Sequence, residues 1–501
     1  MFLWLLFASC THPCAPDELV TNEGVCVSQD DGSDADDTDD DSAMVLLTGP
    51  CEAPDGLAAD PLELTGQVRL VQTEPGGGHL VELIDVHLDG DRGYGVGQGG
   101  LEVYDITDTN DPRYLYSYPQ APNFARYHRA LVLAPGIVAM ANRDEGLVIA
   151  DVRGDSEGDL LFSKPSYGME ALAWDSDEGV LLVGMRGQGV LVVELDDDWS
   201  GTEVGLVAGP TATWAYSNPA GGWIYAADAI EGVVPIDVSN PRAPAAATGV
   251  LVGGDVRHIA QSQGVIYAAI GAGGVAVLEA SDPSAPVLVT TVETGSSAVQ
   301  VAVGDGLLWA VDHDGVAVFD LSDPLAPALL HRETTEQFAL AVAARGEQAW
   351  VGDWNLFSGF HADPTKRAPK LDLPASRLYA DPTSTTTVFT VTNRGSDDLV
   401  LTGASVQGAE LTVQVDRATI PPGEQAELTL TGPGGALDAT VCIASNDPDD
   451  PVQEFLLQTT DGETLLGQDA PDFCLVDTEG VEHCLSDHAG RPVVLAYFAT
   501  W

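Results

Sequence analysis

Basic residues are scarce in this chain of 501 residues. Lysine and arginine together number 20, whereas aspartate and glutamate number 77, which gives a formal net charge of −57. Lysine occurs only as Lys164, Lys366 and Lys370, so no basic cluster is present. A surface of this charge repels phosphate backbones, which argues against nucleic acid as a partner. A protein or a small ligand is the kind of partner that we expect.

Motifs that would indicate catalysis or metal binding are also missing. The chain has no C-x-x-C pair, no HExxH, no Walker loop and no G-x-S-x-G elbow, so structural zinc sites and the common hydrolases find no support. The segment GVGQGG at 95–100 fits the dinucleotide pattern formally. It leads into a strand rather than a helix, so we predict tight turns there and no bound cofactor. After the first ten residues, no apolar run is long enough to span a membrane.

The first ten residues, MFLWLLFASC, form a short apolar run that ends in two small residues and a cysteine. This pattern resembles the lipobox of bacterial lipoproteins, which implies a signal peptide over residues 1–10 and a lipid on Cys10. The resemblance implies export to the outer membrane, the cell surface or the periplasm, with membrane attachment only through this anchor. An ordinary signal peptide is the alternative.

Six further cysteines agree with export, because disulfides persist in oxidising compartments. Cys14 and Cys26 are close enough in sequence to close a small loop, and we expect Cys474 and Cys484 to face each other across a hairpin. A structural disulfide is the favoured interpretation of each pair. No partner is assigned to Cys51 or Cys442.

An aspartate-rich segment separates the N-terminal cysteines from the rest of the chain. Residues 28–42, SQDDGSDADDTDDDS, contain eight aspartates and almost nothing apolar. Like charges repel one another, so the segment predicts an extended tether within residues 11–62. Alternating aspartates can imitate a Ca²⁺ loop, but the glycine and distal glutamate of an EF-hand are not in place. A tether is therefore the simpler interpretation, with Ca²⁺ the one cofactor considered.

A repeat of 41 to 46 residues runs through the middle of the chain. Each copy has a glycine followed by an alternating apolar strand that ends in an acid, as in GLVIAD from Gly146. In three copies a turn such as DVSNPRAP follows, in which Ser or Asp closes the turn and Pro ends the ladder. Each period predicts about four short strands. The six clear copies begin at Gly100, Gly146, Gly189, Gly232, Gly274 and Gly315, and a weaker seventh spans 356–361.

Four-stranded units at this spacing fit the blades of a β-propeller, where each blade buries its faces against its neighbours. The repeats resemble the LVIVD family, named for the strand that stands here as LVIAD. Over residues 63–371 the resemblance implies a mainly β fold with a seven-bladed propeller. The segment LTGQVRLVQTEPG before the first copy resembles an outer strand, and we expect it to close the ring by joining the last blade.

Residues 372–462 alternate apolar and polar residues, with turn signals near every tenth position, which is typical of a small β-sandwich. The elements TVTNRG, IPPGE and SNDPDDP resemble Hydin-like immunoglobulin domains. This resemblance implies an Ig-like spacer or adhesion module without catalytic activity.

Residues 463–501 resemble the start of the redoxin branch of the thioredoxin fold, through APDF, LSDHAGRPVVL and FATW. In that family the nucleophilic cysteine follows the tryptophan, and this chain ends at Trp501. We therefore expect an incomplete thioredoxin-like segment that supplies no catalytic residue. An exported thiol-disulfide oxidoreductase or thiol peroxidase, with its cysteine beyond Trp501, is the alternative function.

Equivalent positions of the blades converge on the central channel of a propeller, where we expect any ligand or partner to bind. Polar residues near the inner-strand starts and in the loops after the second strands are the candidates. They are His128, Arg143, Glu170, Arg186, Asp228, His258, His313 and Asp353, with Arg129 and Arg257 beside two of them. Charged rims are what soluble propellers show to water, so solvated rim residues are the favoured interpretation, and a ligand or partner surface is the alternative. The sequence thus predicts an exported, surface-tethered and non-enzymatic binding or interaction scaffold, with no metal site.

Overall fold

The computed structural model describes residues 44–70, 82–119, 127–374, 376–381 and 383–459, and the backbones of four short outlying strands. Residues 1–43 form one unit and residues 44–501 another. In the first unit, β1 (Glu18–Val20) pairs antiparallel with β2 (Cys26–Ser28). Cys10, the predicted Cys14–Cys26 bridge and most of the aspartate-rich tether lie outside the described residues. Throughout the described chain the regular elements are strands, and no helix there could cross a membrane.

Five four-stranded antiparallel sheets follow one another along the chain, each ordered from an inner to an outer strand. We call them blades 1 to 5, with β5–β8 as blade 1 and β21–β24 as blade 5. Their strands are β5 (Leu83–Asp89), β6 (Arg92–Gly97), β7 (Gly100–Asp105), β8 (Arg113–Tyr118), β9 (Arg129–Ala134), β10 (Ile137–Asn142), β11 (Gly146–Asp151), β12 (Asp159–Lys164), β13 (Met169–Asp175), β14 (Val180–Met185), β15 (Gly189–Leu195), β16 (Gly201–Val207), β17 (Thr213–Tyr216), β18 (Trp223–Asp228), β19 (Gly232–Asp237), β20 (Ala245–Ala246), β21 (His258–Ser262), β22 (Val265–Ala269), β23 (Val275–Glu279) and β24 (Val287–Val292).

A seven-stranded sheet contains two further blades that share one long strand. The first part of β28 pairs with β27 as the outer strand of blade 6, and its last part pairs with β29 as the inner strand of blade 7. β4 pairs with β30 as the outer strand of blade 7, which confirms the predicted closure by the segment before the first repeat. The strands are β25 (Gln300–Val303), β26 (Leu307–Val311), β27 (His313–Asp320), β28 (Ala328–Arg345), β29 (Gln348–Asp353), β30 (Leu356–Ala362) and β4 (Leu62–Arg69).

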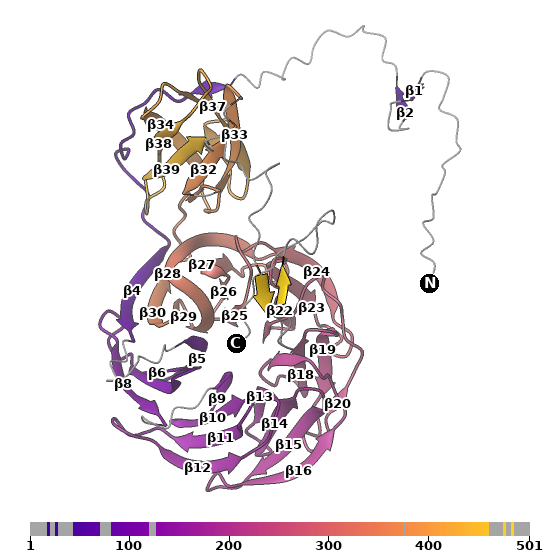
Figure 1. Ribbon diagram of the computed structural model, residues 1–501. Helices are drawn as coiled ribbons and strands as arrows, with labels where there is room; N and C mark the ends of the chain where they lie inside the picture. Colours follow the sequence, from indigo (N-terminus) through magenta and orange to yellow (C-terminus); the bar gives the residue numbers. More distant parts are fainter. Residues whose placement is uncertain are drawn as a thin grey trace. The chain divides into compact units, whose positions relative to one another are not determined.

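The seven blades form a closed ring around a central channel (Figure 1). Each inner strand contacts the inner strand of the next blade, and β28 contacts β5, so the last blade meets the first. Most of the core lies between neighbouring blades, where the middle strands such as β10 and β14 are buried along their whole length. At the closure, Phe357 of blade 7 stacks on Trp350 and on Tyr104 of blade 1, with ring centroids 4.8 and 4.0 Å apart.

The repeated glycine opens the third strand of blades 1 to 4, and two of its positions show why glycine is needed. Gly146 and Gly189 have φ angles of 109° and 115°, which side chains rarely tolerate. A Cβ at either residue would also lie within 2.5 Å of a carbonyl oxygen of the outer strand. The predicted turns are present as well, since the Asp237 carboxylate accepts the backbone N–H of Ser239.

Two five-stranded sheets outside the propeller share one hydrophobic core, so they form a β-sandwich. The strand orders are β3-β35-β37-β33-β31 and β32-β39-β38-β34-β36. The strands are β3 (Val45–Leu46), β31 (Leu371–Asp372), β32 (Arg377–Ala380), β33 (Thr386–Asn393), β34 (Leu399–Gln407), β35 (Thr412–Val415), β36 (Thr419–Ile420), β37 (Gln425–Thr431), β38 (Asp438–Ser445) and β39 (Val452–Thr459).

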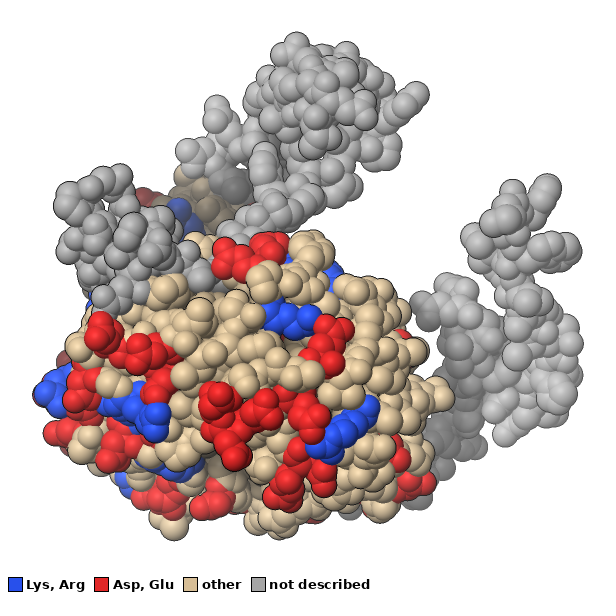
Figure 2. Space-filling view, turned by 90° about the horizontal axis from the view of Figure 1, so that it is seen from below, with Lys and Arg blue, Asp and Glu red and all other residues tan. Residues whose placement is uncertain are grey.

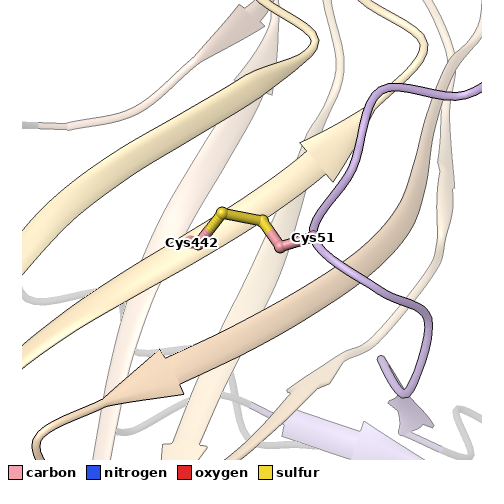
Figure 3. Close-up of a disulfide and its surroundings, with 2 residues drawn as sticks. All are labelled: Cys51 and Cys442. Carbon is pink, nitrogen blue, oxygen red and sulfur yellow. A yellow bond between two sulfur atoms is a disulfide. The ribbon is translucent and has the colours of Figure 1, made fainter.

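Residues that precede the propeller belong to this sandwich, which corrects the assignment of the whole of 11–62 to a tether. β3 pairs with β35, and Leu47 is buried in the sandwich core. Cys51 forms a disulfide with Cys442 of β38, across a sequence separation of 391 residues (Figure 3). The chain therefore enters the sandwich, runs through the whole propeller and returns to complete the sandwich. Local sequence patterns carry no signal of such a long-range pairing.

Near the C-terminus, β40 (Cys474–Val476) pairs antiparallel with β41 (Glu482–Cys484), and Cys474 lies opposite Cys484 in the register. The hairpin expected between these cysteines is present. The disulfide between them stays a prediction, because their side chains lie outside the described residues. The other redoxin-like positions lie outside them too.

Candidate functional site

The inner strand of four blades begins with an irregularity of the β-bulge type. In these blades the pairing between the first two strands skips one residue, namely Ile84, Glu170, Trp214 or Leu340. In the other three blades the residue just before the first pair is His128, Arg257 or Val299. Its backbone N–H donates to the residue that faces its successor, as His128 does to Ala141. A bulge turns one side chain away from the regular pleat and is common next to functional sites.

One such residue from each blade lines a cavity of about 340 Å³ at one end of the channel. We call these seven residues the mouth ring: Ile84, His128, Glu170, Trp214, Arg257, Val299 and Leu340. Its polar and aromatic members come from consecutive blades 2 to 5, and its aliphatic members come from blades 6, 7 and 1. The mouth ring is therefore polar on one side and apolar on the other.

Trp214 is the centre of the polar side of the mouth ring. The guanidinium carbons of Arg143 and Arg186 lie 5.5 and 5.7 Å from the centroid of its ring. Both arginines also contact Glu170, whose Oε1 accepts a hydrogen bond from Arg143 Nε at 2.6 Å and from Arg186 Nη1 at 3.2 Å. Only 2% of Glu170 is exposed. This buried carboxylate therefore holds two cations against one aromatic ring.

Several buried polar atoms around the mouth ring have no hydrogen-bond partner within the described protein. They are Glu170 Oε2, Trp214 Nε1 and Arg257 Nε. The nearest carboxylate to Arg257 Nε is that of Asp255, at 3.8 Å, which is beyond hydrogen-bond range. A buried polar group without a partner costs on the order of 1–3 kcal/mol, so such groups commonly mark a place for water or a ligand.

Arg129 forms the floor beneath the mouth ring. Its guanidinium donates to the backbone carbonyls of three mouth-ring residues, at 3.0 Å to Trp214, 3.4 Å to Ile84 and 3.5 Å to Arg257. These carbonyls come from blades 4, 1 and 5, so one side chain reaches across the channel. Arg129 lines both the mouth cavity and a second cavity further along the channel.

The second cavity, of about 320 Å³, is lined by the inner strands of all seven blades, and we call it the inner chamber. Asp85 is buried in its wall and accepts hydrogen bonds from Gln300 Nε2 at 2.7 Å and from the backbone of Ala130 at 2.9 Å. Burial acts to raise the pKa of Asp85, but His87 and Arg129 together hold it well below its usual range. Burial and Arg129 lower the pKa of His258 to about 3, so His258 is neutral in this wall.

The structure brings half of the predicted candidates together and leaves the other half apart. His128 and Glu170 belong to the mouth ring, Arg143 lines the same cavity, and Arg186 contacts two of its residues. His258 faces the inner chamber. The remaining candidates, Asp228, His313 and Asp353, line neither cavity.

Asp228 and Asp353 are structural residues. Both are at most 1% exposed. Asp228 accepts the backbone N–H groups of Ala212 and Ile230, and Asp353 accepts that of Gln337, so each carboxylate ties neighbouring loops together. His313 has a φ of 70°, and burial together with the nearby Arg257 lowers its pKa.

A second polar cluster lies apart from the channel, where Asp60, His331, Glu333 and Asp449 bring potential ligand atoms within 4.8 Å of one another. The ammonium of Lys370 already contacts Asp449 at 2.8 Å and Glu333 at 3.2 Å. His331 donates or accepts through Nε2 toward Asp449, at 2.8 Å, while its buried Nδ1 has no described partner. A metal-bound histidine normally donates its other N–H to an acceptor. The cluster therefore fits an ionic junction between propeller and sandwich better than a metal site.

The chemistry available at the mouth ring is that of ionic, hydrogen-bonding and aromatic contacts. The described lining of its cavity contains no serine, threonine, cysteine or lysine. The cationic side chains there stand out in so acidic a protein. Over the flank of the propeller seen from the side of β12 and β16, acidic side chains are spread among neutral ones with some basic ones between them (Figure 2).

One family model matches part of this chain and supports the repeats identified in the sequence. The LVIVD repeat family matches residues 220–251 and 253–294, within blades 4 and 5. Among solved structures, the WD40 β-propeller domain of Doa1 is 13% identical, with a TM-score of 0.47 over 61% of this chain and 99% of that chain. The computationally designed Ika8 protein is 11% identical, with a TM-score of 0.42 over 57% of this chain and 98% of that chain. No curated protein matches the chain.

Proposed function

We propose that this chain is an exported binding protein, tethered to the cell surface through its N-terminus, whose propeller holds a ligand at the mouth ring. The observation that carries the proposal is the mouth ring itself. Every blade contributes one side chain to it from the start of its inner strand, and buried polar atoms there have no described protein partner. A concave site with a few convergent polar groups is the usual form of a ligand site.

Two features support export. The lipobox resemblance at Cys10 provides an anchor, and the Cys51–Cys442 disulfide is of the kind that persists in oxidising compartments. The sandwich, which resembles a Hydin-like immunoglobulin domain in sequence, would act as a spacer between the anchor and the propeller. The proposed function is binding alone, without a catalysed reaction.

The location is tested in cells that make the protein. Addition of protease to intact cells should remove the propeller from the cell-associated protein, and a labelled fatty acid should be incorporated into the wild type but not into a Cys10→Ala variant. A propeller that is protected until the cells are lysed would rule out surface tethering. Failure of the Cys10→Ala variant to change labelling would rule out the lipid anchor.

The binding role is tested by native mass spectrometry of protein isolated from the same cells. We expect a small-molecule adduct on the wild type and its loss from a Trp214→Phe/Arg257→Gln variant. The matched control is Arg113→Gln, because Arg113 is exposed and pairs with Asp105 away from the mouth ring. An adduct retained by the mouth-ring variant would place any ligand elsewhere and refute the proposed site.

A further inference from the structure

We infer that the mouth ring binds a small uncharged molecule with an apolar body and one polar end that both accepts and donates hydrogen bonds. This inference rests on the binding function proposed above and names the class of ligand. The polar end would accept hydrogen bonds from Trp214 Nε1 and Arg257 Nε and would donate one to Glu170 Oε2. The apolar body would lie on the aliphatic side of the mouth ring.

The first support is the balance of charge in the lining of the mouth cavity. The lining holds three basic and three acidic residues, whose formal charges cancel: Arg129, Arg143, Arg257, Glu82, Glu170 and Asp255. An ionic ligand would therefore add a charge that no excess of opposite charge in the lining compensates. Burial of an uncompensated charge is costly, which favours a ligand without net charge.

A ligand ammonium meets a specific obstacle at Glu170. Arg143 Nε and Arg186 Nη1 already lie 2.6 and 3.2 Å from its Oε1. An ammonium that reached the other oxygen of this carboxylate would stand beside two guanidinium groups and be repelled by both. An uncharged N–H or O–H group can donate to Glu170 Oε2 without that repulsion.

A ligand carboxylate meets the opposite obstacle. Arg257 Nε lies 3.8 Å from Asp255 Oδ2, and Arg129 Nη1 lies 3.9 Å from Asp85 Oδ1. A second carboxylate at either arginine would lie close to one that is already there, and like charges repel. An uncharged carbonyl or hydroxyl oxygen can accept from the same donors without this cost.

The second support is that the buried atoms without described partners include both donors and an acceptor. Trp214 Nε1 and Arg257 Nε are donors, and Glu170 Oε2 is an acceptor. Glu82, which is 5% exposed, adds another buried carboxylate to the lining. A carboxylate only accepts hydrogen bonds and an ammonium only donates them, whereas a carboxamide or a hydroxyl group does both.

These three atoms belong to mouth-ring residues of consecutive blades 3, 4 and 5. Arg143 joins the first two, because its Nε donates to Glu170 and its guanidinium carbon lies 5.5 Å from the centroid of the Trp214 ring. Arg129 joins the last two, because it donates to the backbone carbonyls of Trp214 and Arg257. The three atoms are therefore on one side of the mouth ring, where a single polar end can face them.

The third support is the arrangement of the apolar side. Val299, Leu340 and Ile84 come from blades 6, 7 and 1 and line the same cavity as the polar residues. A polar end joined to an aromatic or aliphatic body uses both sides of the mouth ring. The cavity of about 340 Å³ is at the small end of the range for ligand sites, which favours a small molecule.

The test is isothermal titration of the purified full chain with four molecules that share one apolar body. They are phenylacetamide, its N,N-dimethyl derivative, the anion phenylacetate and the cation phenethylamine. We expect phenylacetamide to bind about tenfold or more tightly than either ion, and about tenfold more tightly than the dimethyl amide, which accepts but cannot donate. An ion or a dimethyl amide that binds as tightly as phenylacetamide would overturn the inference.

Two variants place the ligand at the mouth ring. Trp214→Phe removes the indole N–H and should weaken phenylacetamide by about fivefold. Arg257→Met removes the other donor and leaves the lining with a net negative charge, so phenethylamine should gain affinity relative to phenylacetate. The matched control is Trp174→Phe, because Trp174 Nε1 is also buried without a described partner but lines neither cavity.

Thermal melts check that each variant folds, and each of the two variants keeps the test valid if the other does not fold. Unchanged phenylacetamide binding in folded Trp214→Phe, or an unchanged ratio of amine to carboxylate affinity in folded Arg257→Met, would contradict the assignment. An equal loss in Trp174→Phe would contradict it as well.

The outcomes separate this inference from the function on which it rests. If phenylacetamide does not bind at millimolar concentration, the inference of an uncharged ligand is overturned. If native mass spectrometry then shows an ionic adduct that is lost on mouth-ring substitution, the proposed binding function survives. If the adduct is unaffected by those substitutions, both fall.

Discussion

Replacement of both cysteines, as Cys51→Ser/Cys442→Ser, is expected to destabilise the sandwich while the propeller remains folded. The disulfide joins residues with a sequence separation of 391. A disulfide stabilises mainly by removing loop-closure entropy from the unfolded chain, so its effect grows with the loop that it closes. If the whole chain unfolded at once, a loop of this length would correspond to a stabilisation of about 6 kcal/mol.

The propeller shortens the effective loop. Ala362 pairs with Leu62 between β30 and β4, so a folded propeller already holds the two ends of its own segment together. The loop that the disulfide then closes consists of residues 52–61 and 363–441, about 90 residues, for which the same relation gives about 4.6 kcal/mol. That value corresponds to a change of roughly 2,000-fold in the equilibrium for opening the sandwich.

Two readouts separate the domains. Seven of the nine tryptophans lie between Trp174 and Trp354, in the propeller, so tryptophan fluorescence follows mainly the propeller. Hydrogen exchange of the slowest amides in β33, β37 and β38 follows the sandwich core. We expect these amides to lose about three orders of magnitude of protection in the double variant, with the fluorescence transition in urea unchanged. Wild-type protein reduced with dithiothreitol is the control for the serine substitutions.

Two results would refute this reasoning. Protection in the sandwich that stays within tenfold of the wild type would show that the disulfide does not limit its unfolding. A fluorescence transition that shifts together with the sandwich would show that the propeller and the sandwich unfold as one cooperative unit.

Three further substitutions test the propeller. Glu102 is 1% exposed, and burial raises its pKa to about 7, above the value in the unfolded chain. The contribution of Glu102 to stability is therefore complete at acid pH and is lost as the pH rises through about 7. The free energy of unfolding of the wild type, measured by urea denaturation, should therefore fall by up to about 3 kcal/mol between pH 4.5 and pH 8, relative to Glu102→Gln, and parallel pH profiles would contradict this. Phe357→Ala at the closure between blades 7 and 1 should lower the free energy of unfolding, measured by urea denaturation, by about 3–5 kcal/mol. A loss below about 1 kcal/mol would show that the stack is not essential. Arg332→Met leaves the buried Asp312 without its main cation and should lower the free energy of unfolding by about 3–5 kcal/mol. Asp312→Asn in the same chain should restore part of this loss. No recovery would contradict the pairing.

The ring could be predicted from sequence because its causes are local and repeated. A glycine with positive φ that touches the outer strand recurs in several blades, as at Gly146 and Gly189, and its period is visible without a structure. The closing strand could be identified because it repeats the pattern of other outer strands. The shared strand β28 could not, because its continuity depends on how two blades meet and not on a local signal. The Cys51–Cys442 pairing is non-local in the same sense.

The candidate site was only partly predictable. Mouth-ring residues are 41 to 44 positions apart, so the period points to them, but the local course of each inner-strand start decides which of two neighbouring side chains faces the cavity. For that reason the sequence favoured His258, whereas the mouth ring holds Arg257. A search limited to charged residues also missed Trp214 and the apolar side of the ring. Alignment of the inner-strand starts without regard to residue type would have found both.

The most direct test of the central claim is hydrogen exchange of the whole chain with and without the small-molecule fraction of the cells that make it. We predict slower exchange confined to peptides that contain the inner-strand starts near Ile84, His128, Glu170, Trp214 and Arg257, with the sandwich strands and outer strands unchanged. Slower exchange at the outer strands or in the sandwich, with none at the inner-strand starts, would contradict a ligand site at the mouth ring.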